Sequence, residues 1–351
     1  MLFGICTKGK MMNITFFIGN GFDIGMGMKS RFKDFFPIYQ EKSMYKEARI
    51  KQLSDEIGDD YDTWADFEAA LGEYTINFDH ETKKDFIDQI RDFESEFMDY
   101  LKVNEDAAQL NNNEQLEALM KNALVQFYST NNLAFESSEA VAKVYYVHNS
   151  ENHKYNFVNF NYTATLKKCL GSISQSIVQK RKIGNVEKID KVGEVLHVHG
   201  ECGLYPIIGV NDINQIANKE LAEDENFTRY IVKPSINKFL RRAKDVDATR
   251  IINQSTIVCI YGMSLGTTDK KWWNLLITWL FGSGERQLVI FDYDDQFKTS
   301  TQFDWLEKED SIISKLEKYN VEPKIKLASL RSRIHIAVHK NIFSIDNVKE
   351  N

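Results

Sequence analysis

The chain has 351 residues, of which 43% are hydrophobic and 27% are charged. This composition is typical of a globular protein with one large domain or two smaller ones. The formal net charge of -7 excludes a bulk positive field that would hold a phosphate backbone, so nucleic acid is not expected as a partner.

The first predicted element is a short strand at residues 13–18, which runs into a glycine turn. From residue 61 to residue 149 the pattern is helical, because apolar and aromatic side chains recur at helical spacing, and Asp66 can cap the first helix. We interpret residues 61–149 as a helical insertion that covers a cleft or builds a self-association surface. A homo-oligomer is therefore one assembly that the sequence leaves open.

Strand-like segments return in the second half of the chain, each followed by a polar or glycine-containing loop and mostly by a helical stretch. They are residues 156–160, 194–199, 256–260 and 287–292. Residues 226–245 are predicted to be helical, and residues 272–281 are predicted to form a very apolar, buried helix. This alternation predicts an α/β fold with a mostly parallel sheet flanked by helices. We expect a Rossmann-like nucleotide-binding domain built from residues 13–60 and 150–340.

The cysteines show no CxxC spacing, which argues against a disulfide framework and against a zinc module. No apolar run approaches the roughly 18 residues of a membrane-spanning helix, and residues 1–10 lack the apolar core of a signal peptide. We therefore expect a cytoplasmic protein with no membrane partner. Because Met11 and Met12 directly precede the first strand, we interpret residues 1–10 as an upstream start that adds little to the fold.

The glycine turn after the first strand contains Gly19, Asn20, Gly21, Phe22 and Asp23. With the glycine that follows two residues later, it resembles the fingerprint of dinucleotide-binding folds, in which glycines let the backbone approach a pyrophosphate at a helix N-terminus. The spacing, GxGxxxG, is one residue longer than the usual pattern. The turn is predicted to bind a nucleotide, and the alternative is a tight strand-to-helix turn without a ligand.

A second group of polar residues follows the strand at residues 156–160. Asn159, Asn161 and Thr163 lie at its carboxyl end, which is where ligands bind in open α/β sheets. We predict that Asn161 and Thr163 contact the ligand. The alternative is that Asn159 and Asn161 satisfy the backbone groups of a turn.

Two histidines with period-2 spacing lie at the end of the strand at residues 194–199. His199 stands next to Gly200 at the carboxyl edge, so we predict that it is a general base, whereas His197 is predicted to be packed. A metal needs a third ligand, and only Glu201 or Cys202 lies nearby. We therefore predict no metal site.

A fourth loop, residues 260–269, combines glycines, hydroxyl groups and an acid. Such a loop can wrap a ribose or a phosphate, so Gly262, Ser264 and Asp269 are predicted to bind the nucleotide. The alternative for Asp269 is that it caps the next helix.

These motifs, IGNGFD, VNFNYTATL, HVHG and GMSLGTTD, occur in an order that resembles the AbiH family of bacterial phage-abortive-infection proteins. Trp64 with Glu68 and the segment at residues 208–212 extend the likeness, which covers residues 13–338. The series is also similar to the sirtuin-like fold, in which a glycine turn, an asparagine-bearing strand end, a His-Gly pair and a late Gly-x-Ser loop surround NAD.

The sirtuin-like resemblance implies a role for each position. Gly19 and Gly21 would lie against the pyrophosphate, and Gly262 with Ser264 would line the adenosine side. Asn161 would position water and ribose, and His199 would be the general base.

The sequence also departs from the sirtuin-like pattern. Thr163 stands where these enzymes usually have an aspartate that holds the carboxamide, and Asp23 stands where they usually have a serine. The paired cysteines of the protein deacetylases are absent, so the resemblance does not imply deacetylation.

The resemblances together predict a toxic NAD glycohydrolase that needs no metal. In this hypothesis His199 deprotonates a ribose hydroxyl or the water that Asn161 orients, and NAD is cleaved to nicotinamide and ADP-ribose. Such an enzyme must be silent until infection, which implies control by assembly, by a phage-derived activator or by a neighbouring defence protein. The alternative is a non-catalytic sensor that binds NAD, ADP-ribose or a related nucleotide and acts through a partner, and Thr163 favours this alternative.

Overall fold

The computed structural model describes residues 11–61, 66–108, 110, 113–293 and 301–345. In these residues a seven-stranded sheet has the strand order β3-β4-β2-β1-β5-β6-β7. Neighbouring strands are parallel except for β3 and β4, which form an antiparallel hairpin at one edge. The strands are β1 (Met11–Ile18), β2 (Asn152–Asn159), β3 (Ile177–Ile183), β4 (Val186–His197), β5 (Ile257–Tyr261), β6 (Gln287–Asp292) and β7 (Ile334–Val338).

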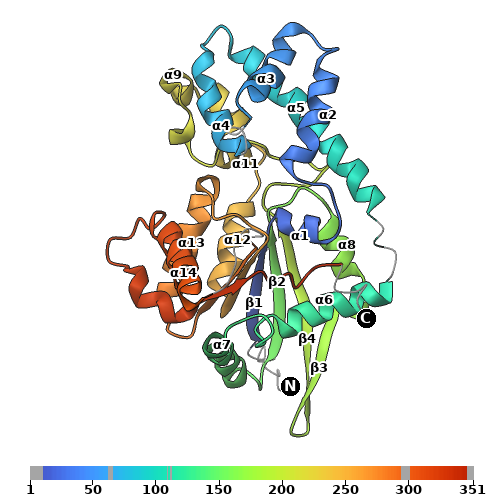
Figure 1. Ribbon diagram of the computed structural model, residues 1–351, viewed down its shortest axis with the longest axis vertical. Helices are drawn as coiled ribbons and strands as arrows, with labels where there is room; N and C mark the ends of the chain where they lie inside the picture. The colour runs from blue at the N-terminus through green and yellow to red at the C-terminus, as the bar shows by residue number, and fades with distance from the viewer. Residues whose placement is uncertain (1–10, 62–65, 109, 111–112, 294–300, 346–351) are drawn as a thin grey trace, which may run out of the picture.

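Helices cover both faces of the sheet and also form a lobe beyond one end of it (Figure 1). One face carries α1 (Asn20–Gly25), α6 (Asn113–Gln126), α7 (Phe135–Val147) and α8 (Thr165–Gly171). The opposite face carries α12 (Lys244–Asn253), α13 (Lys270–Phe281) and α14 (Gln302–Glu317). The helical lobe consists of α2 (Phe32–Ser43), α3 (Ala48–Asp59), α4 (Phe67–Tyr74), α5 (Lys83–Ala107), α9 (Lys219–Glu223), α10 (Glu225–Ile231) and α11 (Lys233–Phe239).

The parallel part of the sheet grows outward from β1 in two directions. The chain first adds β2 and β4 on one side of β1, and it then returns to add β5, β6 and β7 on the other side. The connections that follow β1 and β5 therefore leave the sheet in opposite directions. In α/β proteins such a switch point opens a crevice at the carboxyl ends of the two strands, and ligands bind there.

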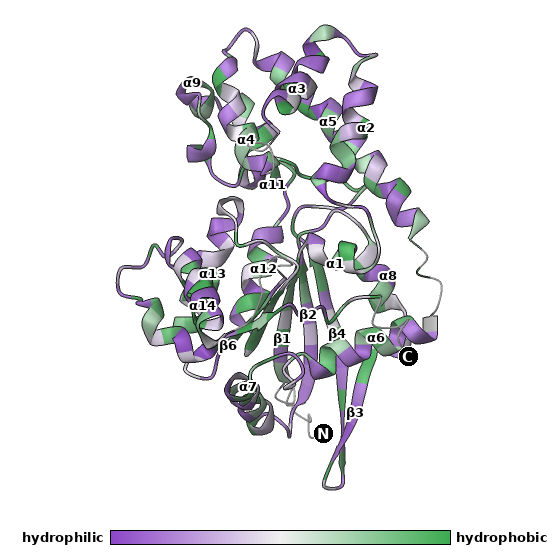
Figure 2. Ribbon diagram, viewed as in Figure 1, coloured by the Kyte–Doolittle hydropathy of each residue, from purple (hydrophilic) through white to green (hydrophobic). Residues whose placement is uncertain are grey.

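The central strands are continuous apolar runs because helices cover both faces of the sheet. All residues of β5 are buried, and β1 is buried from Ile14 to Ile18. Figure 2 shows hydrophobic residues along β6, whereas the middle of β3 is hydrophilic. On α13, Trp272 and Trp279 are each 2% exposed, so the predicted buried helix is confirmed. No helix in the described ranges is long and apolar enough to cross a membrane.

The α/β class and the mostly parallel sheet flanked by helices are confirmed, while the sirtuin-like character of the fold stays a prediction. The sequence did not predict β3 or β7. The region at residues 226–245 is not one helix. Asp224 caps α10 by accepting a hydrogen bond from the Asn226 backbone at 2.8 Å, and Pro234 lies in the first turn of α11, where its missing N–H costs nothing.

The helices at residues 61–149 do not pack as one unit. Helices α4 and α5 bury their aromatic faces in the helical lobe, where they pack with α2 and α3 from the preceding segment and with residues 208–232. Helices α6 and α7 pack on the sheet instead. Amphipathic spacing predicts that a helix has an apolar face, but the spacing does not specify which partner covers that face.

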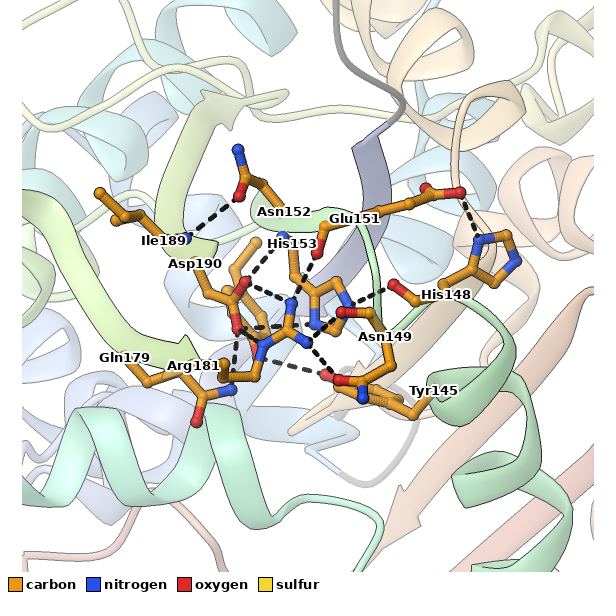
Figure 3. Close-up of polar contacts among 11 residues, drawn as sticks. Tyr145, His148, Asn149, Glu151, Asn152, His153, Gln179, Arg181, Ile189 and Asp190 are labelled. Carbon is orange, nitrogen blue, oxygen red and sulfur yellow. Dashed lines mark hydrogen bonds and ion pairs between the residues drawn. The ribbon is translucent and has the colours of Figure 1, made fainter. Parts of the chain in front are cut away.

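An ion pair between a buried carboxylate and a partly buried guanidinium fixes the base of the β3–β4 hairpin (Figure 3). The Asp190 side chain is 0% exposed, and its Oδ2 lies 2.7 Å from the Arg181 Nε. Arg181 also donates to the backbone carbonyls of Asn149 and Glu151, and the His153 backbone N–H donates to Asp190 Oδ1 at 2.8 Å. The network joins both hairpin strands to the start of β2.

We expect Arg181→Met to lower the free energy of unfolding by about 3 kcal/mol, because it leaves the Asp190 carboxylate buried without its cation. Urea denaturation measures this loss. The double variant Arg181→Met/Asp190→Leu is expected to recover most of the stability, and a double variant as unstable as the single one would contradict this role for the pair.

Candidate functional site

A cavity of about 330 Å³ lies where the carboxyl ends of the central strands meet the helical lobe. Its polar side comes from the loops that follow β1, β2, β4 and β5, and its apolar side includes four phenylalanines of the lobe, Phe32, Phe67, Phe93 and Phe97. This volume is at the lower end of the range for small-molecule pockets. The predicted site residues that line it are Gly19, Asn20, Asp23, Asn161, Thr163, His199, Gly262, Ser264 and Asp269.

Two predicted site residues, Gly21 and Phe22, do not line the cavity. The Gly21 N–H donates to the Gly262 carbonyl at 2.9 Å, and a Cβ added at Gly21 would lie 2.5 Å from the Gly262 Cα. Phe22 is fully buried and packs edge-on against Phe343, with ring centroids 5.4 Å apart. Gly21 holds the loops after β1 and β5 together and Phe22 packs in the core, so the structure places both outside the cavity lining.

Gly262 is required by its backbone conformation and by its neighbours. Its φ of +68° lies in the left-handed region, and an added Cβ would lie 2.7 Å from the Phe22 backbone nitrogen. The Gly19 N–H donates to the Tyr261 carbonyl at 2.9 Å, which ties the two loops together at the switch point. Glycines at this crossing thus permit the approach that brings both loops to the cavity.

Asn161 links the loop after β2 to the loop after β1. It is 6% exposed, its Nδ2 donates to the Gly19 carbonyl at 3.0 Å, and its backbone N–H donates to Asn159 Oδ1 at 3.2 Å. The alternative interpretation, in which these asparagines satisfy turn backbone groups, is therefore correct for both. For Asn161 the two interpretations are compatible, because the same side chain lines the cavity.

Asp23 is a buried acid on the wall of the cavity. It is 1% exposed, and its Oδ2 accepts a hydrogen bond from Thr163 Oγ1 at 2.7 Å. Its Oδ1 has no hydrogen-bond partner among the described residues. Burial raises the pKa of Asp23 to about 7, although the Thr163 hydrogen bond and the nearby Asn161 amide act in the opposite direction.

This pKa predicts that stability depends on pH. Between pH 4 and pH 7 the folded chain holds the Asp23 proton and the unfolded chain releases it, so the free energy of unfolding falls as the pH rises through this window. Above about pH 7 the contribution is lost and the curve is flat. We expect the difference between the wild type and Asp23→Asn to change by a few kcal/mol across the window in urea titrations. A difference that is constant from pH 4 to pH 8 would contradict the raised pKa.

His199 lines the cavity. The sequence predicts that it lies at an exposed strand edge, but in the structure it is buried. It is 8% exposed, its ring packs edge-on against Phe160, and Lys233 Nζ lies 3.4 Å from its Nε2. Burial and, after it, the Lys233 charge lower its pKa well below the usual value, so the imidazole is neutral at pH 7. This histidine is buried because the loop after β4 turns back at Gly200 and because the helical lobe covers the histidine.

His197, the last residue of β4, lies apart from the cavity. It is 2% exposed, and its Nδ1 lies 3.3 Å from the Asn161 carbonyl. The prediction that it is a packed residue is confirmed. Among the described residues, no group of three or more His, Cys, Asp or Glu side chains could hold a metal ion.

Asp269 and Ser264 line the cavity from the loop after β5. Asp269 occupies the N-cap position of α13, but its side chain makes no capping hydrogen bond, so the capping alternative is wrong. Burial raises the pKa of Asp269. The Asn211 amide lies beside Asp269 and donates to the Thr268 carbonyl, which ties this loop to residues 208–212.

An ion pair that the sequence interpretation missed connects the helical lobe to His199. Lys233 is 2% exposed and lies 2.5 Å from Glu68, which lines the cavity from α4. Glu68 could have been found, because it is part of the family pattern. Lys233 gave no signal, because it is one of several cations in a basic segment. Trp64, the other lobe residue of that pattern, lies outside the described residues, as do residues 1–10.

Comparison with known proteins identifies the family of the chain. No curated protein matches it. The model of the family described as "Bacteriophage abortive infection AbiH" matches residues 15–292, and this range contains every residue that lines the cavity. Because this match covers more than half of the chain, the protein belongs to the AbiH family of bacteriophage abortive infection proteins.

Proposed function

We propose that this protein hydrolyses the N-glycosidic bond of NAD in the cavity and thereby stops phage replication by stopping the host. Membership of the AbiH family indicates a role in abortive infection. The observation that supports a nucleotide substrate is the convergence of Gly19, Asn161, His199 and Gly262 on one cavity at the switch point of a parallel sheet. The sirtuin-like arrangement of the same motifs supports NAD as that nucleotide.

In the proposed reaction, NAD and water give nicotinamide, ADP-ribose and a proton. The bond between the ribose carbon and the nicotinamide nitrogen breaks, and the bonding electrons leave with the cationic ring. His199 is neutral because it is buried, and a neutral imidazole is the form that accepts a proton from water or from a ribose hydroxyl. Asn161 orients that oxygen, and the phenylalanines of the helical lobe keep bulk water away from the reacting groups.

The contact between Lys233 and His199 supports a silent resting state. The Lys233 ammonium of α11 lies 3.4 Å from Nε2 and can only donate, so in this contact Nε2 is the acceptor and the proton of the neutral imidazole is on Nδ1. Because Glu68 holds the same ammonium from α4, the base becomes free only when this part of the lobe moves. We propose that a phage-derived activator, a neighbouring defence protein or self-assembly supplies that movement.

The same contact favours a second candidate function. A cavity whose base is held by an ammonium can bind NAD, ADP-ribose or a related nucleotide without cleaving it, and can report binding through the helical lobe. This sensor would act through a partner.

Nicotinamide release separates the two functions. Purified protein is incubated with NAD, alone and with lysate of phage-infected cells, and nicotinamide and ADP-ribose are followed by chromatography. The hydrolase proposal predicts equal amounts of both products in at least the activated sample. Saturable NAD binding with no nicotinamide in either sample would replace the hydrolase with the sensor.

A further inference from the structure

We propose that the cavity is the subsite for a cationic, amide-bearing aromatic ring, and that the free oxygen of Asp23 accepts a hydrogen bond from this ring's amide while the carboxyl group gives its proton to solvent. This inference rests on the proposed function, because the cationic nicotinamide ring of NAD is such a group. It assigns Asp23 a ligand contact at the ring and not at the pyrophosphate.

The charges on the cavity wall favour a cation over a diphosphate. Three carboxyl groups line the cavity, those of Asp23, Glu68 and Asp269, and none of the described lining residues is Lys or Arg. The nearby Lys233 ammonium is already paired with Glu68 at 2.5 Å. A diphosphate placed against the remaining acids would be repelled, whereas a cationic ring would be attracted.

The apolar side of the cavity suits a flat ring of the same charge. Phe32, Phe67, Phe93 and Phe97 all line it, and aromatic faces bind cations and stack on heteroaromatic rings. A cavity of about 330 Å³ is small for a whole dinucleotide but is ample for one ring with its sugar. The rest of the dinucleotide would lie outside the acidic part of the cavity.

The Asp23 carboxyl group is prepared for a ligand contact. Thr163 already binds Oδ2 at 2.7 Å, so that the carboxyl plane is fixed, while Oδ1 is buried and without a partner. A buried polar atom without a partner costs free energy, and a ligand N–H that reaches it recovers that cost. Sirtuin-like enzymes usually have an acid at the position of Thr163. Here Thr163 instead holds the acid Asp23, which comes from the glycine turn after β1.

Of the titratable groups around Asp23, the neighbours are either ion-paired or neutral, so we expect Asp23 to be the group that loses a proton when a cation binds. Glu105 of α5 raises the Asp23 pKa but is itself paired with Lys168 at 2.6 Å. Burial raises the pKa of the thiols of Cys169 on α8 and of Cys202, so both stay neutral near pH 7. A cation in the cavity therefore favours the Asp23 carboxylate, and binding releases up to one proton for each ring bound below pH 7 and none well above it.

Calorimetry on the full chain tests this inference with 1-methylnicotinamide, a cation, and nicotinamide, its neutral counterpart. The wild type is expected to bind the cation at least tenfold more tightly at pH 8. Affinity for the cation should rise about tenfold per pH unit below pH 7 and level off above it, because the Asp23 pKa is about 7.

Variants separate Asp23 from general charge effects. Asp23→Asn keeps an oxygen for Thr163 but cannot ionise, so its affinity for the cation should fall at least tenfold at pH 8 and lose its pH dependence. The exposed Asp99→Asn, which removes the same charge elsewhere, should match the wild type. Thr163→Val removes a hydrogen bond that lowers the Asp23 pKa, so the midpoint of the pH dependence should move upward. This variant also reports on Asp23 if Asp23→Asn does not fold.

The two proposals fail in different ways. Equal affinity for cation and neutral ring, or a pH dependence that persists in Asp23→Asn, overturns the assignment of Asp23 even if NAD is cleaved. Cation binding that follows the predicted pattern without any nicotinamide release from NAD overturns the hydrolase and leaves the ring subsite in place.

Discussion

His199→Ala is expected to lower the rate of NAD cleavage by about 10²–10⁴-fold and to abolish toxicity in cells, because a general base contributes a factor of this size. The fold should survive, since the ring is held by one contact to Lys233 and by packing on Phe160. Asn161→Ala should resemble His199→Ala, because an amide that orients the reacting oxygen acts together with the base. Nicotinamide release under single-turnover conditions measures both losses.

Two other histidines serve as controls. His335 on β7 is 3% exposed, its Nε2 lies 2.8 Å from the Gln287 Oε1, and it does not line the cavity. His335→Ala and His197→Ala should lose stability before they lose activity, because each removes a packed ring and its hydrogen bonds. The hydrolase proposal fails if His199→Ala binds NAD normally and still protects cells against phage.

Gly262→Ala is expected to lower the free energy of unfolding by 3 kcal/mol or more, on the order of the cost of a left-handed alanine plus a backbone collision. Its φ is +68°, and the new Cβ would lie 2.7 Å from the Phe22 nitrogen and 2.8 Å from the Gly21 Cα. Both contacts are with backbone, so the loops after β1 and β5 must separate. Urea denaturation measures the loss, and nucleotide binding should be lost with it.

Two other glycines separate the two costs of Gly262→Ala, the left-handed backbone conformation and the backbone collision. Gly203 has a φ of +77° with nothing within 4 Å of an added Cβ, so Gly203→Ala should show only the conformational cost of about 1–2 kcal/mol. Gly21 has no positive φ, and its added Cβ would lie 2.5 Å from the Gly262 Cα, so Gly21→Ala shows the collision alone. If Gly262→Ala is no less stable than Gly203→Ala, the close approach of the loops does not hold the site together.

Much of the sheet was predictable because buried parallel strands are apolar on both faces. The residues of β1, β5 and β6 are short, nearly continuous apolar runs that end in glycine or polar turns, and each was expected within a few residues of its position. The hairpin strand β3 was missed, because Lys180, Arg181 and Lys182 give it the composition of a surface loop. Besides its ladder with β4, this strand is held by the ion pair between Arg181 and Asp190, which no local pattern reveals.

The cavity wall was predictable for the same reason, since parallel strands present their carboxyl ends at one edge of the sheet. Polar residues that directly follow β1, β2 and β5 therefore met at one place. The residues that the sequence misplaced or missed depend on the direction of a side chain or on contacts with segments distant in the sequence. Phe22 turns into the core, and Gly21 contacts Gly262 and not the cavity. Glu68 and Lys233 come from helices whose docking on the sheet is set by tertiary packing.

The ligand position in a crystal structure with ADP-ribose or NAD tests the central claim most directly. We expect the ligand to occupy the cavity between the loops after β1 and β5 and the helical lobe. Asn161 and His199 should face the ribose and, for NAD, Asp23 should face the nicotinamide ring. A nucleotide bound elsewhere on the molecule, with this cavity empty at saturating ligand, would contradict it.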